Sequence, residues 1–482
     1  MVSGENCRMY KDMTTSIDLT LALQLRKQPE TFHSIDLLSP AASGLTTPER
    51  LDPYWDRIWA NGSTVTWRSY ESAEAQVIAG LGALPSAHRI AEADAWRQLE
   101  SPQTRKALLR FLSVLGTWRT MTAEQAETLS GSRGTSKVLS GLIAAAFRAG
   151  ILELGSPAAG LIRESTSNRG ILYRPSNSKA VQRILDNLTY PEWVSLTGGQ
   201  KWDQGGQFDR HNVLATELGL RVAEYCDVAT VVGEKLSTID LLAGSGIGWG
   251  PLTGDTRSAD LTIVRPDGLK IAVEITASTS ANFSRKVERW ARLLNDRPMD
   301  ESGLAVVFVI APPHGASATA VRTETYKTIA AVARRFPGTV RESIASRIGV
   351  ANWTTWFPER HLVSTSFFPL SVDMPAEMVN GAMTWQQAEM LNPKTYRYSP
   401  NHLGLTAILD NMHLLWGTPV WLRDHRRAPS LIPTIMERSG VSAVPIPYSK
   451  TLRDVTPGGH VPGKGKGAVG DTKMPKRLLP YM

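Results

Sequence analysis

The stretch Ser258–Trp290, SADLTIVRPDGLKIAVEITASTSANFSRKVERW, decides the fold. It predicts a strand, a tight turn, a second strand and then a helix. The turn is signalled by Pro-Asp-Gly at 266–268, because proline presets φ at the first corner and glycine accepts a positive φ. Counting outward along both strands from this loop places Asp260 directly across from Glu274.

The two faces of this hairpin have different characters. One face carries both carboxylates, whose Cβ atoms are expected about 5 Å apart. Like charges directly opposite each other are destabilising unless a cation or a shared proton offsets them. Hard divalent cations such as Mg²⁺ are bound by one or two carboxylates, so the pair predicts either a metal site or a solvated face on which two acids meet. The opposite face is apolar and is expected to face the core; it carries Leu261, Ile263, Ile271, Val273 and Ile275.

Composition limits the function only broadly. The chain has 482 residues, enough for two or three domains, and its hydrophobic content of 42% is ordinary for a globular protein. We find no apolar run near about 18 residues and no apolar segment behind a basic start, so neither a membrane span nor a secretory signal is expected. A net charge of +8 favours a polyanionic partner. Cys7 and Cys226 have no metal-ligand spacing, which favours a reducing, cytoplasmic location.

Residues 1–100 contain an aromatic cluster. Such side chains favour buried packing against the next domain, with stacking on nucleotides as the alternative. The cluster comprises Tyr54, Trp55, Trp59, Trp67 and Tyr70.

Residues 101–190 predict three helices, over 101–118, 122–129 and 135–149, and then two short strands at 151–154 and 170–174. This order resembles a winged helix-turn-helix, in which the third helix enters the major groove and the wing touches the DNA backbone. Docking onto another protein is the alternative use of such a unit. The resemblance implies DNA contacts from Arg133, Thr135, Ser136, Lys137, Arg163 and Arg169.

A second domain is expected from about residue 208. Its helices are predicted at Asp209–Cys226, 281–295 and 319–336, and a continuous apolar strand at 304–311. Together with the hairpin they predict an α/β sandwich with a mixed central sheet. The glycine-rich stretch 244–250 lacks the Gly-Lys-Ser/Thr ending of a phosphate loop and is interpreted as a flexible loop over the site.

This order resembles the PD-(D/E)xK nuclease core, which is a helix, a β-hairpin carrying the acids, a helix and a strand. More narrowly, the winged helix followed by His211-Asn…Glu217 and by Asp260…Glu274-Ile-Thr276 is similar to the bacterial and phage replication-relaxation family, over roughly residues 100–340. The resemblance implies that Asp260 and Glu274 are metal-binding acids and that Glu217 is a further acid of the site.

The chain departs from the family pattern at one position. The pattern requires a lysine two residues after the glutamate, where this chain has Thr276. Lys270 lies on the right face but roughly 13 Å along the strand from Glu274, which is too far. Lys286, near the start of the following helix, is the candidate replacement, with Arg289 on the same face. The alternative is a basic helix face, solvated or holding a DNA backbone, made of Arg285, Lys286, Arg289 and Arg292.

The resemblance therefore implies a DNA-binding protein of a phage or mobile element, acting in replication or relaxation. Its endonuclease-like site would use Mg²⁺ or Mn²⁺ bound by Asp260 and Glu274. A catalytically inactive DNA-binding protein, or a phage structural protein that uses the fold as a docking groove, is the alternative. Expected partners are DNA, a second copy of the chain or other phage or plasmid proteins. The predicted catalytic residues are Glu217, Asp260, Glu274 and Lys286.

The C-terminal part is predicted from composition and periodicity. Residues 351–370 are aromatic-rich and are expected to close the sheet, and helices are predicted at 374–390 and 404–415. The expected segments are a Trp-rich extension (1–100), a winged helix-turn-helix (101–190), a nuclease-like domain (208–370), a helical region (371–456) and a basic flexible tail (457–482).

Overall fold

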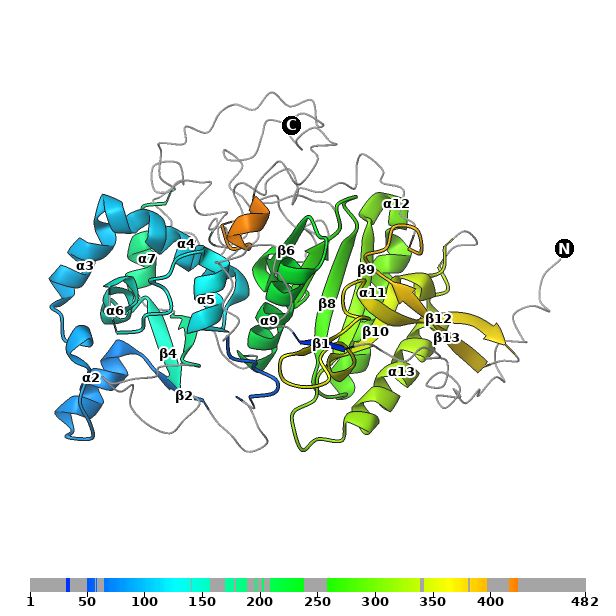
Figure 1. Ribbon diagram of the computed structural model, residues 1–482, viewed down its shortest axis with the longest axis horizontal. Helices are drawn as coiled ribbons and strands as arrows, with labels where there is room; N and C mark the ends of the chain where they lie inside the picture. Colours follow the sequence, from blue (N-terminus) through cyan, green and yellow to red (C-terminus); the bar gives the residue numbers. More distant parts are fainter. Residues whose placement is uncertain are drawn as a thin grey trace, which may run out of the picture.

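The computed structural model describes the chain over a set of separate ranges. Within them the protein is a mixed α/β molecule with two regions, one around a four-stranded sheet and one around a seven-stranded sheet (Figure 1). Every helix in these ranges falls short of the length and apolar character that crossing a membrane requires. The described ranges are 32–34, 50–56, 58, 65–139, 141–156, 170–176, 179–188, 196, 202, 209–237, 258–338, 342–379, 382–396 and 416–423.

The first region combines helices with a sheet of order β2-β4-β5-β3. The two predicted wing strands are present as β4 and β5, which pair antiparallel with Leu154 opposite Tyr173. The elements are β2 (Thr66–Arg68), α2 (Tyr70–Ile78), η2 (Ser86–His88), α3 (Glu92–Glu100), α4 (Pro102–Trp118), β3 (Met121–Thr122), α5 (Ala123–Ser130), α6 (Gly141–Arg148), β4 (Leu152–Ser156), β5 (Leu172–Pro175) and α7 (Lys179–Leu185).

Local sequence signals begin and end these helices. Ser101 caps α4, because its hydroxyl accepts a hydrogen bond from the Thr104 N–H at 3.3 Å. Thr122 and Gln125 form the predicted capping box at the start of α5. Gly131 ends α5 in the left-handed conformation, with φ of 65°. The first two predicted helices are therefore confirmed.

The third helix differs from its prediction. We expected it over 135–149, but α6 begins at Gly141. Residues 132–139 form turns and bends instead. The Thr135 hydroxyl donates a hydrogen bond to the Ser132 carbonyl at 2.7 Å, and local side-chain bonds of this kind compete with helix formation.

The second region is built on a sheet of order β13-β12-β10-β9-β8-β7-β6. Strands β8, β9 and β10 run parallel and the other neighbours run antiparallel, so the predicted mixed sheet is confirmed. The elements are α9 (Asp209–Tyr225), β6 (Thr230–Gly233), η3 (Glu234–Leu236), β7 (Leu261–Val264), β8 (Lys270–Thr276), α11 (Ala281–Asp296), α12 (Met299–Ser302), β9 (Leu304–Ile310), α13 (Ala318–Arg335), η4 (Ile344–Arg347), β10 (Ile348–Asn352), α14 (Trp353–Trp356), β11 (Leu362–Ser364), β12 (Ser371–Val379), β13 (Ala382–Glu389) and η6 (Val420–Arg423).

Helices cover both faces of this sheet. On one face, α11 and α13 form a core with β9 in which Val287, Trp290 and Phe308 are fully buried. On the other face, α9 packs Leu214 and Leu218 into the core that also contains the apolar face of the hairpin. Figure 1 shows α9 between the sheet and the helices of the first region.

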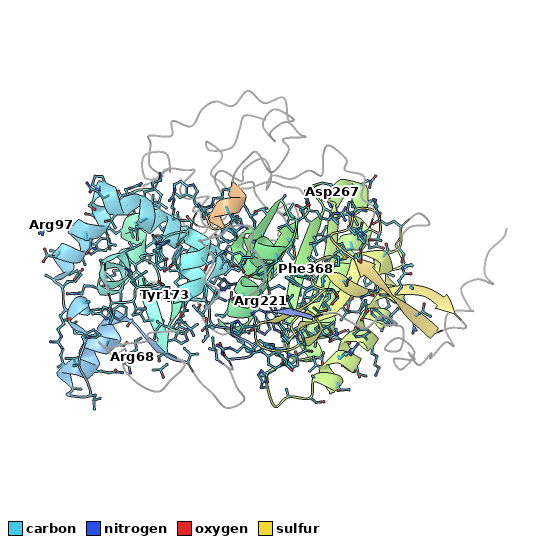
Figure 2. The ribbon with its side chains drawn as sticks, in the orientation of Figure 1. Arg68, Arg97, Tyr173, Arg221, Asp267 and Phe368 are labelled. Carbon is cyan, nitrogen blue, oxygen red and sulfur yellow. The ribbon has the colours of Figure 1, made fainter. Side chains whose placement is uncertain are left out.

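The hairpin of β7 and β8 has the predicted register. Val264 lies opposite Lys270 and Leu261 opposite Val273, and Gly268 has φ of 90°. The turn itself lies at an edge of the molecule, where Asp267 is labelled in Figure 2. All seven residues of β8 are buried, so the alternative of a solvated hairpin face is wrong for this strand.

The predicted helix over 374–390 is wrong. These residues belong to strands β12 and β13, which pair antiparallel and extend the sheet beyond β10. Val372 and Met374 alternate along β12 into one core, while Met383 and Trp385 of β13 enter the other. In the region 371–456, which was predicted to be helical, the described residues form strands β12 and β13 and, at Val420–Arg423, the short 3-10 helix η6. The predicted helix at 404–415 and the tail from 457 lie outside the described residues.

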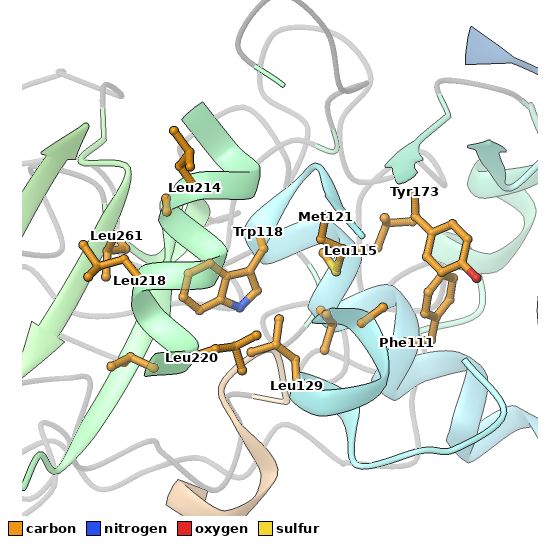
Figure 3. Close-up of a cluster of buried hydrophobic side chains, with 14 of the residues drawn as sticks. Phe111, Leu115, Trp118, Met121, Leu129, Tyr173, Leu214, Leu218, Leu220 and Leu261 are labelled. Carbon is orange, nitrogen blue, oxygen red and sulfur yellow. The ribbon is translucent and has the colours of Figure 1, made fainter. Parts of the chain in front are cut away.

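The two regions share one core at the end of α4. Trp118 is buried beside Leu115, Leu214 and Leu218, and its indole N–H donates to the Gly417 carbonyl at 2.7 Å (Figure 3). Two glycines make room for its ring. A Cβ added at Gly219 of α9 or at Gly233 of β6 would come within 2.6 or 2.7 Å of that ring. The close approach of backbone to indole requires glycine at both positions.

The predicted aromatic cluster is buried in part against the second region. Tyr54 stacks on Trp353 with ring centroids 5.7 Å apart, and the Trp55 indole N–H donates to the Phe357 carbonyl at 3.0 Å. Trp59 lies outside the described residues. Packing, and not nucleotide stacking, is therefore the role of Tyr54 and Trp55.

Candidate functional site

The acid pair lies where two neighbouring strands run side by side. Asp260 directly precedes β7 and Glu274 lies in β8, and the register of Leu261 with Val273 places the two acids opposite each other as predicted. Glu274 is fully buried beneath α11, whereas Asp260 is partly exposed.

Each carboxylate has one oxygen held by the fold. The Ile275 backbone N–H donates to Asp260 Oδ2 at 2.6 Å. The Trp290 indole N–H donates to Glu274 Oε1 at 2.6 Å. These two bonds fix both side chains and leave Asp260 Oδ1 and Glu274 Oε2 as the remaining oxygens.

Lys286 contacts the remaining oxygen of Glu274. Its Nζ lies 2.6 Å from Glu274 Oε2, and its side chain is 34% exposed. Lys286 and Trp290 are four residues apart on α11, so both project from one face of the helix onto Glu274. Arg289 is more distant, with 3.8 Å between its guanidinium and Glu274 Oε1. The predicted approach of Lys286 to the acids is confirmed.

The electrostatics of the pair follow from burial. Burial raises the pKa of Asp260 and of Glu274 above their ordinary values, although the Lys286 charge opposes both shifts. Burial also acts to lower the pKa of Lys286, but the charges of Glu274 and Asp260 outweigh it and raise that pKa above its usual value. Lys286 is therefore a firmly protonated counter-ion of the acids.

His211 is also a neighbour of the acid pair. Its place in the sequence motif did not predict this contact. It lies in the first turn of α9 and hydrogen-bonds to the backbone of Ile275. Burial, with the charges of Lys286 and Arg210 in addition, lowers its pKa to about 4. The imidazole is therefore neutral at physiological pH.

Glu234 is a third acid near the pair, and the sequence interpretation missed it. Gly233 lies opposite Leu261, so Glu234 follows at the level of Asp260, whose pKa its charge raises. The Glu234 carboxylate is occupied by Arg119 at 2.9 Å and by the Asn212 amide at 2.8 Å. No local signal identifies it, because β6 and β7 are separated by residues 234–260 in sequence.

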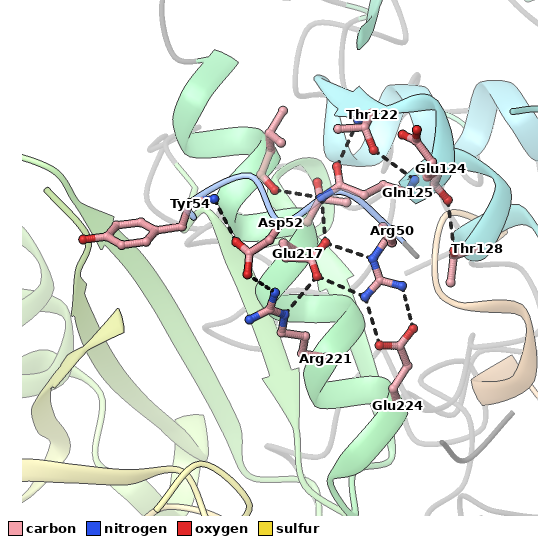
Figure 4. Close-up of polar contacts among 12 residues, drawn as sticks. Arg50, Asp52, Tyr54, Thr122, Glu124, Gln125, Thr128, Glu217, Arg221 and Glu224 are labelled. Carbon is pink, nitrogen blue, oxygen red and sulfur yellow. Dashed lines mark hydrogen bonds and ion pairs between the residues drawn. The ribbon is translucent and has the colours of Figure 1, made fainter. Parts of the chain in front are cut away.

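Glu217 does not join the acid pair, which corrects its predicted role. Its carboxylate accepts hydrogen bonds from Arg50 at 2.9 Å, from Arg221 at 2.9 Å and from the Gln125 amide at 3.0 Å (Figure 4). Burial acts to raise the pKa of Glu217, but the charges of Arg50 and Arg221 outweigh it and lower the pKa to about 2. Glu217 is a permanent anion in a structural ion network.

The same network binds an N-terminal segment, residues 50–56, to both regions. Arg50 also donates to Glu224 at 2.8 Å, and Arg221 pairs with Asp52 at 2.8 Å. Since Gln125 belongs to α5 and Glu224 to α9, residues 50–56 connect the two regions. Glu217, Arg221 and Glu224, which α9 places along one face at i, i+4 and i+7, are thus buried ion-pair partners.

The remaining lysine alternative is also settled by position. Lys270 is buried on β8, four residues before Glu274, and burial lowers its pKa to about 7. Thr276 stands buried at the position where the family pattern has a lysine. Among the described lysines that the sequence singled out, Lys286 is the one that contacts the acids.

The predicted recognition helix is covered by the protein itself. Leu142 to Phe147 of α6 are all buried, and the Phe147 ring lies 5.0 Å from His88 and 5.7 Å from Tyr70. Elements that precede the winged unit, α2, η2 and α3, therefore pack against α6. Reading of bases by this helix is not supported.

The six predicted DNA-contact residues have different surroundings. Thr135 is fully buried, which removes it from any DNA surface. Ser136 hydrogen-bonds to Glu127. Arg133 and Lys137 are exposed, so for them a phosphate contact stays a prediction. Arg163 and Arg169 lie outside the described residues.

The acid pair offers the donors that a hard cation prefers. Asp260 and Glu274 supply carboxylate oxygens, and backbone and indole donors already hold one oxygen of each in place. Within the described ranges, no group of three His, Cys, Asp or Glu side chains is arranged to hold a metal ion. A divalent cation at this pair would therefore keep several water or phosphate ligands, as Mg²⁺ commonly does.

Comparison of the chain with protein-family models, with curated proteins and with solved structures found no significant match.

Proposed function

We propose that this chain is a DNA-binding protein with a metal-dependent endonuclease-like site at Asp260 and Glu274. One observation carries the proposal: Lys286 reaches Glu274 from α11 and supplies the ammonium that Thr276 cannot. A lysine beside a carboxylate pair suits phosphodiester hydrolysis, because its ammonium can stabilise the negative charge that develops on the phosphate as it reacts.

The topology supports the same proposal. The order α9, β6–β8, α11 and β9 is a helix, an antiparallel meander, a helix and a strand parallel to β8. It agrees with the nuclease core that the sequence resembles. The winged unit and the link to a phage or mobile element, acting in replication or relaxation, rest on the resemblance and belong to the proposal.

The residues would divide the work as follows. Asp260 and Glu274 would hold Mg²⁺ or Mn²⁺, which supplies Lewis acidity and a water of lowered pKa when bound. Trp290 and the Ile275 N–H keep the two carboxylates in place. Lys286 would bind a non-bridging phosphate oxygen and stabilise the charge that develops there. Arg133 and Lys137 would bind the DNA backbone.

Cleavage of supercoiled plasmid tests the proposal. We expect the wild-type protein to nick or linearise plasmid DNA with Mg²⁺ or Mn²⁺ and to be inactive with EDTA. Glu274→Gln keeps the size of the side chain but removes its charge, and should abolish cleavage. Arg97→Gln on α3 is the matched control, since the Arg97 side chain is 78% exposed and lies far from Asp267 of the acid-bearing hairpin (Figure 2). Clean protein that cuts neither single- nor double-stranded DNA with any divalent cation would contradict the proposal.

A second candidate is a catalytically inactive protein that uses the same fold to bind DNA or another protein. It is favoured by the fact that both oxygens of Glu274 already have partners, and by the commitment of Glu217 to Arg50. DNA affinity that falls steeply with salt, without cleavage, would indicate the DNA-binding form. Salt-insensitive or absent DNA binding would indicate docking of a protein.

A further inference from the structure

We infer that Lys286 occupies the cation position of the acid pair in the free protein and competes with a divalent cation for it. The inference rests on the proposed function for the identity of the site. It adds that the lysine is a resident counter-ion which has to leave Glu274 before the site can be loaded.

The arrangement of the carboxylate oxygens carries this inference. Asp260 Oδ2 and Glu274 Oε1 are held by neutral N–H donors of Ile275 and Trp290. The Arg289 guanidinium lies beyond hydrogen-bond distance, 3.8 Å from Glu274 Oε1. Glu274 Oε2 is held by the Lys286 ammonium at 2.6 Å. Because Trp290 already holds Oε1, a cation that binds Glu274 together with Asp260 would meet the Lys286 ammonium at Oε2.

Lys286 is less constrained by its surroundings than the neutral donors are. The Trp290 ring is fully buried in the core beneath α11, and the Ile275 N–H belongs to β8. The Lys286 side chain is 34% exposed on a long flexible stem. A substrate phosphate is the anion that would receive the displaced ammonium. Cation and phosphodiester should therefore bind cooperatively, each by relieving the cost that the other would meet alone.

Terbium luminescence tests the competition. Trp290 contacts Glu274, so Tb³⁺ bound at the acid pair would be excited through this indole. We expect Lys286→Gln to bind Tb³⁺ at least about tenfold more tightly than wild type does. The substitution removes the repulsion between the Lys286 ammonium and the bound cation. Displacement of Tb³⁺ by Mn²⁺ should show the same ratio.

Three further variants control the experiment. Lys286→Arg keeps the charge and should bind Tb³⁺ as weakly as wild type does. Arg97→Gln removes one positive charge from an exposed position and should leave the affinity unchanged. Glu274→Gln should lose the signal, which assigns the luminescence to this site. Circular dichroism of each variant shows whether it is folded, and Lys286→Arg keeps the inference falsifiable if Lys286→Gln does not fold.

The outcomes separate this inference from the proposed function. Equal or weaker Tb³⁺ binding by Lys286→Gln, tight binding by Lys286→Arg, or no signal in any variant would overturn it. Tighter binding by Lys286→Gln without DNA cleavage by wild type would support it and contradict the nuclease. Cleavage by wild type with unchanged affinity in Lys286→Gln would support the nuclease and overturn the competition.

Discussion

At the scale of single residues, the buried hydrogen bond from Trp290 to Glu274 can be tested directly by mutation. We expect Trp290→Phe to lower the free energy of unfolding by about 2–3 kcal/mol, because a buried carboxylate oxygen loses its donor. Trp356→Phe is the matched control, since that equally buried indole donates to the neutral Ser371 carbonyl and should cost about 1 kcal/mol. Urea unfolding of both variants measures the difference. Equal losses would show that the Glu274 bond has no special weight.

The imidazole of His211 should make stability depend on pH. Its pKa falls from an ordinary 6.5 to about 4 in the folded protein, because burial disfavours its charged form. The stabilising contribution is therefore complete above about pH 6.5 and is lost as the pH falls through about 4. The loss is at most about 3 kcal/mol, and smaller because the ring is partly exposed.

The variant His211→Gln isolates the contribution of His211 to the pH dependence of stability, because glutamine keeps an N–H donor but does not titrate. The unfolding free energy of wild type minus that of the variant should decrease between pH 6.5 and pH 4. A difference that is constant over this range would contradict the assigned environment of His211.

At the scale of elements, Gly219 in the middle of α9 provides a test in which two effects have opposite signs. Helix propensity alone predicts that Gly219→Ala stabilises the protein by about 1 kcal/mol. The new Cβ would lie 2.6 Å from the Trp118 ring, so we expect a net loss of about 1–3 kcal/mol instead. Gly219→Ala combined with Trp118→Leu should lose less than the sum of the single changes. Stabilisation by Gly219→Ala would contradict the close packing of α4 on α9.

Local sequence signals predicted the elements whose geometry depends on a few neighbouring residues. The hairpin register followed from the Pro-Asp-Gly turn, and α9 and α11 begin within a residue of their predicted starts. β12 and β13 were missed because Met, Ala, Glu and Gln favour helices, although Asn380-Gly381 between them is a hairpin turn signal. The helix preference was given too much weight there.

The candidate site was predictable to the same extent. Asp260 and Glu274 are paired by a local turn, and Lys286 lies twelve residues further along the same stretch. Glu217 was misassigned because its partner Arg50 is 167 residues away in sequence, and no periodicity reveals such a contact. Burial of α6 was missed for the same reason, since α2 and α3 cover it from outside the winged unit.

At the scale of the whole molecule, the ion network around Arg50 joins the regions. Arg50→Met would leave Glu217 and Glu224 buried without their shared cation, at a cost of about 3–5 kcal/mol. Arg183→Met is the control, because its pair with Glu100 is about half exposed and worth at most about 1 kcal/mol. Chemical unfolding followed by circular dichroism gives both values. Similar small losses would show that the network does not hold the regions together.

The central claim is that Asp260 and Glu274 form a site for a divalent cation. A crystal structure of the protein grown with Mn²⁺ and a short non-cleavable DNA tests it most directly. The account predicts an anomalous Mn²⁺ peak in contact with both carboxylates, with Trp290 still bonded to Glu274 and Lys286 moved from Glu274 to a phosphate. An ordered acid pair at saturating Mn²⁺ with no peak, and with Lys286 still on Glu274, would contradict it.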